Sequence, residues 1–147
     1  MDTARWSPTR PALIFCVDDN PDAADSTATL LQASGLNAVP YYGGRDALAA
    51  MNEASPDVCL LDLAMPGMDG VELAGRMRAW AAGRRRPLVL VAVTAHGDPE
   101  SRAKTEAAGF DHHLVKPVRA AELLAITLAL WNSADLPLQV TESESES

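Results

Sequence analysis

Residues 12–21 read ALIFCVDDNP, and the fold prediction depends on this stretch. Six consecutive apolar residues form a run of strand length, and Asp18 and Asp19 end it. A strand that is apolar on both faces is typical of a parallel sheet with helices on both sides. The Asn20-Pro21 pair that follows is a turn signal. The stretch therefore predicts the first strand of an α/β fold, with two carboxylates at its carboxyl end.

The rest of the chain repeats this alternation of short apolar runs and amphipathic segments. Apolar runs predict strands at 12–17, 37–42, 58–61, 88–93 and 111–115, and helical spacing of apolar residues predicts helices at 22–34, 45–53, 71–82, 98–108 and 120–131. Glycines placed to end a helix follow three of these segments, at Gly35, Gly83 and Gly109. Five strands alternating with five helices predict a doubly wound α/β fold with right-handed crossovers.

The length of 147 residues suits one domain with a substantial core. The composition of the ends predicts a flexible lead at 1–9 and a disordered acidic tail at 134–147, which leaves one folded domain at 10–133. No apolar run approaches the roughly 18 residues of a membrane-spanning helix, and the first ten residues lack the apolar core of a signal peptide. We therefore expect a cytoplasmic protein with no membrane segment.

The net charge of −8 argues against direct nucleic-acid binding, which needs clustered Lys and Arg to neutralise phosphates. Arg84, Arg85 and Arg86 form a basic run between a predicted helix and a predicted strand, which indicates a solvated loop. Cys16 and Cys59 lie inside apolar runs and not at the spacing of metal ligands, so we expect buried free thiols.

Polar side chains follow four of the predicted strands: Asp18 and Asp19, Asp62, Thr94, and Lys116. In doubly wound folds the carboxyl ends of the strands meet at one edge of the sheet, so these groups should converge there. Three carboxylates repel one another unless a cation lies among them, and their oxygens suit Mg²⁺. A lysine and a hydroxyl beside them complete a phosphoryl-transfer site with a carboxylate nucleophile. Each residue alone fits a turn or a solvated surface; their joint placement favours a site.

Four segments carry a family resemblance: VDDNPDAADS, LLDLAMPGMDG, VAVTAHG and GFDHHLVKPV. They are similar to the signature segments of bacterial response-regulator receiver domains, and the similarity extends over about residues 12–132. The last segment also resembles the C-terminal receivers of hybrid histidine kinases. The resemblance implies a flavodoxin-like fold with strand order 2-1-3-4-5.

The resemblance also implies roles for individual residues. Asp62 would accept a phosphoryl group from a phosphohistidine on a histidine kinase or phosphotransfer protein. Mg²⁺ would be bound by Asp19, by Asp62 and by the backbone carbonyl of Ala64, with Asp18 contributing through water. Thr94 would be the switch hydroxyl, Lys116 would pair with the phosphoryl group, and the Lys116–Pro117 peptide bond is a candidate for the cis form.

The sequence departs from the family pattern at the position where many members carry Phe or Tyr, which is His113 here. A histidine can rotate and can be charged near neutral pH, so His113 is a candidate switch residue. Its neighbour His112 points to the opposite face of a strand, which argues against a shared metal ion. Ala64 and His96 border the expected phosphoryl position, and we hypothesise that they set the lifetime of the phosphorylated state.

No helix-turn-helix pattern or basic region follows the predicted fifth helix, so we expect a stand-alone or excised receiver that signals to a downstream protein partner. The apolar residues of that helix leave little polar face: Leu123, Leu124, Ile126, Leu128, Leu130 and Trp131. The surplus indicates either deeper burial or an interaction face. Because the family often dimerises through its fourth and fifth helices, a homodimer through that surface is one expectation.

The main reading is a regulatory switch in a phosphorelay, which catalyses only its own phosphoryl transfer and slow dephosphorylation. One alternative is a receiver-like binding scaffold without phosphorylation. The other is a phosphatase of the haloacid-dehalogenase kind. That class needs a D-x-D motif after the first strand, whereas Asp18-Asp19 is followed here by Asn20-Pro21.

Overall fold

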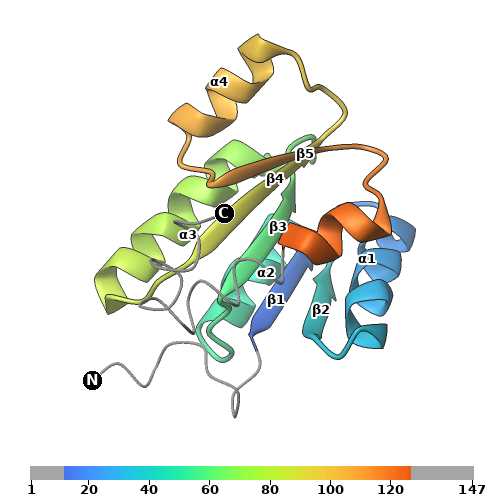
Figure 1. Cartoon of the computed structure of the whole chain (residues 1–147). Coiled ribbons are helices and arrows are strands. Elements are labelled where there is room, and N and C mark those ends of the chain that lie inside the picture. The colour runs from blue at the N-terminus through green and yellow to red at the C-terminus, as the bar shows by residue number, and fades with distance from the viewer. Residues whose placement is uncertain (1–11, 127–147) are drawn as a thin grey trace, which may run out of the picture.

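The structure is a computed structural model, and it describes residues 12–126. Five parallel strands form one sheet in the order β2-β1-β3-β4-β5 (Figure 1). The strands span Leu13–Val17 (β1), Asn37–Tyr41 (β2), Val58–Asp62 (β3), Val89–Thr94 (β4) and His112–Val115 (β5). The doubly wound parallel fold and the strand order predicted from the sequence are confirmed.

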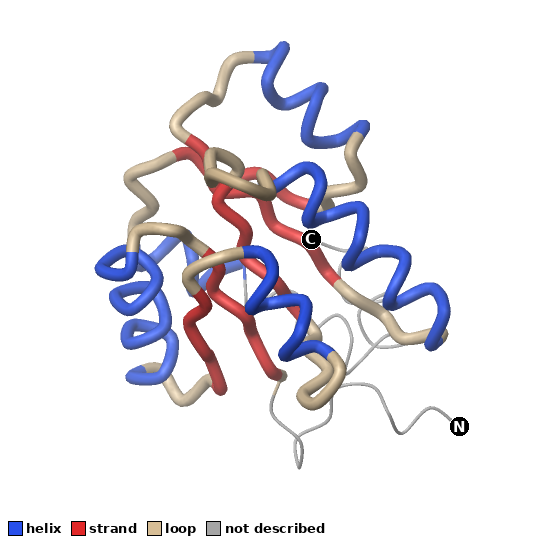
Figure 2. Tube along the Cα trace, turned by 180° about the vertical axis from the view of Figure 1, so that it is seen from behind, coloured by secondary structure: helices blue, strands red, loops and turns tan. Residues whose placement is uncertain are grey.

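Four helices connect the strands: α1 at Pro21–Ala33, α2 at Gly44–Met51, α3 at Gly70–Arg84 and α4 at Pro99–Ala107. A further helical segment begins at residue 120 and reaches 126, where the description ends, so the rest of the predicted helix at 120–131 lies outside the described residues. Seen from behind, the helices flank the sheet on both faces (Figure 2). The predicted lead at 1–9 and tail at 134–147 also lie outside the described part.

The core consists of two apolar clusters, one on each face of the sheet. On one face Phe15 and Leu61 pack with Leu73 and Met77 of α3. On the other face Ile14 packs among residues of α1 and the 120–126 segment, and Leu123 is 3% exposed there. Each such side chain contributes roughly 1.5–3 kcal/mol when it is fully buried. Leu123 of the last helix is therefore core, and Leu124 and Ile126 pack against the same cluster while partly buried. Leu128, Leu130 and Trp131 lie outside the described residues.

Side-chain caps start three of the helices that follow strands. Asn20 accepts hydrogen bonds from the backbone N–H groups of Asp22 and Ala23 at the start of α1. Asp69 accepts one from Glu72 in α3, and Asp98 accepts one from Ser101 in α4. Such caps satisfy N–H groups that have no partner inside the helix, so they fix where α1, α3 and α4 begin.

Gly35 and Gly109 follow helix ends with positive φ angles of 90° and 100°, as the sequence predicts, but the predicted stop at Gly83 is wrong. α3 runs through Gly83 to Arg84, and Arg85 adopts the left-handed conformation with φ of 54°. The guanidinium of Arg84 lies 4.5 Å from the centre of the Trp80 ring. This stacking and the favourable charge at the helix C-terminus extend α3 by one residue beyond the glycine.

The prediction of a solvated basic run is wrong for Arg86. Its guanidinium lies 3.7 Å from the carboxylate of Asp57, whose side chain is 1% exposed. The other oxygen of that carboxylate accepts the backbone N–H of Leu13 at 2.8 Å. This arginine therefore packs against the amino-terminal end of the sheet, because the buried Asp57 needs a positive partner.

Cys16 and Cys59 are buried free thiols, as expected from the sequence. Burial raises the pKa of the Cys16 thiol to about 12 and also raises the pKa of Cys59. Neither thiol is therefore ionised near neutral pH. Within residues 12–126 no helix has the length and apolar character needed to cross a membrane.

Candidate functional site

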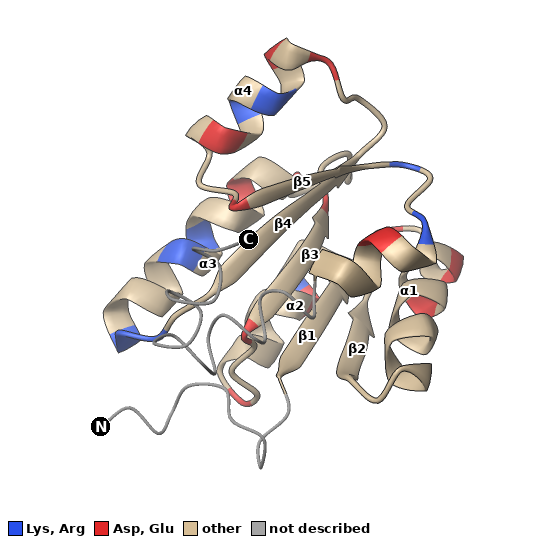
Figure 3. Cartoon of the chain, in the orientation of Figure 1, with Lys and Arg blue, Asp and Glu red and all other residues tan. Residues whose placement is uncertain are grey.

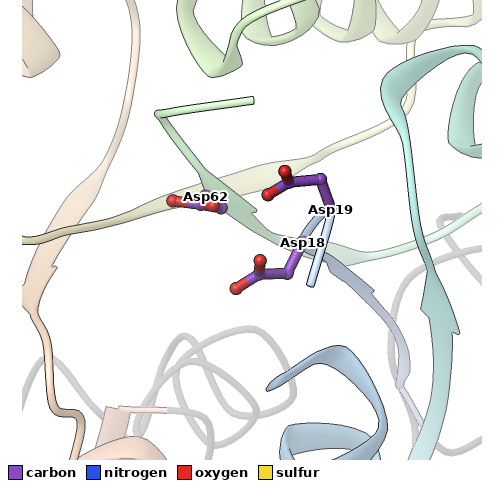
Figure 4. Close-up of side chains that lie close together, drawn as sticks. All are labelled: Asp18, Asp19 and Asp62. Atoms are coloured by element: carbon purple, nitrogen blue, oxygen red, sulfur yellow. The ribbon is translucent and has the colours of Figure 1, made fainter. Parts of the chain in front are cut away.

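Three carboxylates meet at the carboxyl edge of the sheet. Asp18 directly follows β1 and Asp62 is the last residue of β3, and these two strands are hydrogen-bonded neighbours. Ligand oxygens of Asp18, Asp19 and Asp62 all lie within 4.8 Å of one another (Figure 4). Asp62 is 6% exposed and Asp18 is 9% exposed, whereas Asp19 is open to solvent. The structure thus brings together the acidic residues that the sequence placed at strand ends.

Lys116 reaches the same point from β5, which is separated from β3 by β4. Its ammonium nitrogen lies 3.3 Å from an oxygen of Asp18 and 3.4 Å from an oxygen of Asp62. The flexible four-carbon stem of lysine allows this reach across a strand. The peptide bond from Lys116 to Pro117 is cis.

The charges of these groups shift one another's protonation equilibria. The pKa of Asp62 is raised, first because burial removes water from the carboxylate and second because Asp18 is close, while Lys116 opposes the shift. For Lys116, burial acts to lower the pKa, but the carboxylates of Asp18 and Asp62 outweigh it and the pKa is raised. Three carboxylates and one ammonium leave two negative charges. The donor set therefore suits a hard divalent cation with oxygen ligands.

Thr94 lies at the same edge, at the end of β4 between β3 and β5. It is 6% exposed, and its hydroxyl accepts the backbone N–H of His96 at 3.2 Å. Within residues 12–126 no hydrogen bond joins this hydroxyl to Asp62. The structure therefore places Thr94 beside the acidic cluster with its hydroxyl engaged in its own loop.

The loop after Asp62 is held tightly against the strand end. The backbone N–H of Ala64 lies 3.3 Å from a carboxylate oxygen of Asp62, and Gly70 donates to the carbonyl of Leu63 at 3.1 Å. A Cβ atom on Gly70 would lie 2.7 Å from the carbonyl oxygen of Asp62 and from the Cα of Leu63. Gly70 thus lets α3 begin against the site. Sequence reasoning missed this role, although the Asp69-Gly70 pair at a helix start was a usable signal.

His113 lies on β5, and its side chain is half-buried. Its Nδ1 is 2.9 Å from the hydroxyl of Thr105, and its Nε2 is 3.0 Å from the carbonyl of His96. The side chains of His96 and His112 are exposed, and among the described residues no histidine belongs to a metal-ligating group. Sequence reasoning missed Thr105, because an isolated threonine in a charged helix carries no pattern.

A groove of about 540 Å³ opens beside the acidic cluster. It lies between the first turns of α1 and the segment after β5, and its lining includes Ala23, Thr27 and Pro117 together with Asp18 and Lys116. The acidic cluster is therefore reachable from one side of the domain.

Comparisons with known proteins agree with this architecture. A family model for the response regulator receiver domain matches residues 14–128. The sensor protein GacS of Pseudomonas syringae pv. syringae is 34% identical over 138 residues, which are 93% of this chain and 15% of that protein. An uncharacterized 14.6 kDa protein of Leptolyngbya boryana is 34% identical over 113 residues, 77% of this chain and 85% of that protein. The crystal structure of the chemotaxis protein CheY4 of Vibrio cholerae has a TM-score of 0.74 at 28% identity, covering 81% of this chain and 98% of that one.

This chain belongs to the family of response regulator receiver domains, the regulatory domains of two-component signalling systems. Its relatives use such a domain in different contexts. The chain spans about 15% of the length of GacS but most of the Leptolyngbya protein.

Proposed function

We propose that this domain is a phosphorylation-dependent switch and that Asp62 is the residue that accepts the phosphoryl group. The observation that carries the proposal is the position of Asp62. It is a nearly buried carboxylate with an ammonium 3.4 Å away and two further carboxylates within reach of a shared cation. A carboxylate nucleophile beside a metal ligand set and a lysine is the arrangement that phosphoryl transfer requires.

In the proposed reaction an oxygen of Asp62 attacks the phosphorus of a phosphohistidine on a partner protein. A phosphorus–oxygen bond forms while the phosphorus–nitrogen bond breaks, and the electron pair remains on the partner's imidazole. Lys116 stabilises the charge on the transferred group. Thr94 would have to release the N–H of His96 and turn its hydroxyl toward the new phosphoryl oxygens.

Mg²⁺ is the cation we propose for the acidic cluster. Asp19 and Asp62 would be direct ligands together with the backbone carbonyl of Ala64, and Asp18 would contribute through water. The ligand set fits, because hard cations prefer carboxylate and carbonyl oxygens and the cluster carries excess negative charge. When bound, the ion would neutralise charge on the phosphoryl oxygens.

The proposed partners are a histidine kinase or phosphotransfer protein upstream and a protein partner downstream. The groove beside Asp18 and Lys116 offers the upstream partner access to the cluster. A homodimer through α4 and the 120–126 segment is a further proposal. Such a contact would be partly polar on the α4 side, where Arg102, Lys104 and Glu106 are exposed. We place the reaction in the cytoplasm on the basis of the sequence composition.

The lifetime of the phosphorylated state is proposed to depend on Ala64 and His96, which are both exposed near the strand ends. A small Ala64 leaves room for an attacking water molecule, whereas His96 can orient or exclude it. Replacing His96 by alanine should therefore change the dephosphorylation rate. An unchanged rate would remove His96 from this role.

Incubation with acetyl phosphate and Mg²⁺, followed by intact-mass measurement, tests the main proposal. The wild type should gain the mass of one phosphoryl group, and Asp62→Asn should not. An unmodified wild type would contradict the proposal and favour a binding scaffold. Sustained turnover of several phosphate esters would favour the phosphatase class. Omitting Mg²⁺ should abolish the modification if the cation is required.

A further inference from the structure

The carboxyl-terminal part of α3 and the turn after it are rich in arginine. Five of the chain's 12 Lys and Arg residues lie between positions 76 and 86. Figure 3 shows basic residues on α3, which starts beside the acidic cluster and ends at the amino-terminal end of the sheet, where Arg86 meets Asp57. Because the chain as a whole has a net charge of −8, this positive surface is a local feature.

Three of these arginines have carboxylate partners: Arg76 with Glu72, Arg78 with Asp111, and Arg86 with Asp57. Arg84 and Arg85 are exposed, and within residues 12–126 neither of them forms an ion pair with a carboxylate. The carboxyl-terminal end of a helix supplies only about half of one negative charge. In the described part of the chain, most of the charge of these two side chains is therefore uncompensated.

Neutral groups hold Arg84 on the surface. The guanidinium carbon of Arg84 lies 4.5 Å from the centre of the Trp80 ring, and one of its nitrogens lies 3.4 Å from the side-chain oxygen of Asn52. The indole N–H of Trp80 reaches the same oxygen at 3.4 Å. Arg85 follows directly at the C-cap of α3. We call Trp80, Arg84 and Arg85 the basic end of α3; tryptophan and arginine are the residue types that most often dominate binding surfaces.

The other exposed cations of residues 12–126 have acidic residues close by in sequence: Arg45 before Asp46, Arg102 and Lys104 between Glu100 and Glu106, and Arg119 before Glu122. For Arg84 and Arg85 the nearest acidic residues in sequence are Glu72 and Asp98. An acidic ligand would therefore meet less repulsion at the basic end of α3 than at these other positions.

An acidic segment of the same chain has the complementary charge. Residues 134–147 contain Asp135, Glu142, Glu144 and Glu146 and no lysine or arginine. The glutamates alternate with serines in the sequence TESESES at 141–147. In an extended chain, alternate side chains point the same way and lie about 6.6 Å apart, so the three glutamates can form one row.

The acidic segment can reach the basic end of α3. Between Ile126 and Glu142 there are 142 − 126 = 16 steps of chain, which span at most about 55 Å when extended. A domain of about 115 residues has a radius of gyration of about 13 Å. Glu142 and the residues after it can therefore contact either side of the domain. Attachment to the same chain gives the segment an effective concentration on the order of millimolar.

We propose that residues 134–147 dock on the basic end of α3, with the glutamates of TESESES against Arg84 and Arg85. Each exposed ion pair favours an association by roughly 1.5- to 5-fold, so two pairs favour it by about 2- to 25-fold and the contact is reversible. While docked, the segment covers Trp80 and the two arginines and excludes other acidic proteins. The surface lies at the opposite end of α3 from Asp62, so the docking does not depend on the proposed phosphorylation.

Paramagnetic broadening in the full chain locates the segment. A nitroxide is attached through the thiol introduced by Ser145→Cys; Cys16 and Cys59 are buried and do not compete for the label. At about 20 mM salt, amides of residues 80–86 should lose at least half of their intensity, whereas amides around Asp62 should keep theirs. At about 1 M salt, where charges are screened beyond about 3 Å, the intensity should return.

The arginine pair tests the basic side of the contact. Arg84→Gln combined with Arg85→Gln should reduce the ratio of docked to free segment by about 2- to 25-fold and reduce the broadening accordingly. Arg45→Gln combined with Arg119→Gln is the matched control, because it removes the same charge from two other exposed positions. The control should leave the broadening of residues 80–86 unchanged.

The glutamates test the acidic side and leave residues 12–126 unaltered. Glu142→Gln, Glu144→Gln and Glu146→Gln, introduced together with the label, should abolish the broadening. This variant decides the question even if the arginine replacements disturb the end of α3. Ser143→Ala with Ser147→Ala keeps the charges and should preserve the broadening.

Broadening that is equal in the wild type and in the arginine variant, or that is absent from residues 80–86, would overturn the proposal. Residues 1–11 carry Arg5 and Arg10, and broadening confined to them would place the segment there instead. Mixing spin-labelled chains with ¹⁵N-labelled chains that lack the nitroxide separates docking within one chain from contact between copies. Broadening in that mixture equal to that of the labelled chain itself would also overturn the proposal. A failure of acetyl phosphate to modify Asp62 would remove the proposed function and leave this result in place.

Discussion

Replacing Asp62 by asparagine should stabilise the metal-free protein, although it removes the proposed phosphoryl acceptor. The oxygens of the three clustered carboxylates lie within 4.8 Å of one another, and each repulsion at that distance is worth about 3.5 kcal/mol at a surface-like dielectric constant of about 20. The attraction between the ammonium of Lys116 and Asp62, 3.4 Å apart, offsets these repulsions by about 5 kcal/mol on the same scale, and the variant loses it. Because Asp19 and Lys116 are partly solvated, we expect a net gain of about 1–2 kcal/mol.

Urea denaturation in the presence of a chelator measures this gain. The midpoint should rise with an unchanged slope, and thermal unfolding should shift upward by roughly 2–8 °C for a chain of this size. Added salt should shrink the difference because it screens the repulsion. Mg²⁺ should stabilise the wild type more than the variant, since the variant lacks one ligand.

The pH dependence follows from the raised pKa of Asp62, whose ordinary value is 3.8. The folded protein binds this proton more tightly than the unfolded chain does. Ionised Asp62 therefore lowers the free energy of unfolding at pH values above the pKa that Asp62 has in the folded protein. This destabilisation disappears as the pH falls from that pKa toward 3.8. The difference in unfolding free energy between Asp62→Asn and the wild type should shrink over the same pH interval.

Glu53→Gln serves as the matched control, because it removes one negative charge from an exposed position. It should change stability by less than about 0.5 kcal/mol. If Asp62→Asn were no more stable than the wild type in chelator, the account of an uncompensated acidic cluster would be refuted.

Three further substitutions test other parts of the structure, each by urea denaturation. Asp57→Ala should cost about 2–4 kcal/mol, because it leaves Arg86 without its carboxylate, and a loss under 1 kcal/mol would contradict that pairing. Gly70→Ala should lower the free energy of unfolding by about 1–3 kcal/mol and slow phosphorylation, since its Cβ would lie 2.7 Å from backbone atoms. Gly75→Ala in the same helix is the control, because its Cβ would meet open space and should not destabilise the fold. Gly83→Ala should stabilise the fold by about 0.5–1 kcal/mol because this glycine lies inside α3. A destabilised variant would show instead that Gly83 ends the helix.

Gly83 and Arg86 show where local reasoning fails. A glycine near the end of an amphipathic segment is compatible with both a helix stop and a helical residue. The folded chain adds a contact of Arg84 with the Trp80 ring, one turn earlier, which favours the helical residue. The basic run looked solvated because nothing near it in sequence indicates a partner. Arg86 lies opposite Asp57, 29 positions earlier, and only the packed sheet brings them together.

Asp62 could be predicted from the sequence as the central residue of the site, because the carboxyl ends of parallel strands all lie at the same edge of the sheet. Continuous apolar runs indicated the strands, and the polar residue after each run indicated Asp18, Asp62, Thr94 and Lys116. Local patterns carry this information because they encode which segments are buried and where they stop.

The tertiary structure decided how those groups face one another. Lys116 contacts Asp18 across 98 positions of sequence, while the Thr94 hydroxyl bonds within its own loop. The two nitrogens of His113 are occupied by Thr105 and by the carbonyl of His96. Sequence periodicity specifies which face of an element is buried. The direction of a hydroxyl or an imidazole depends on donors and acceptors that only the folded chain brings within about 3 Å.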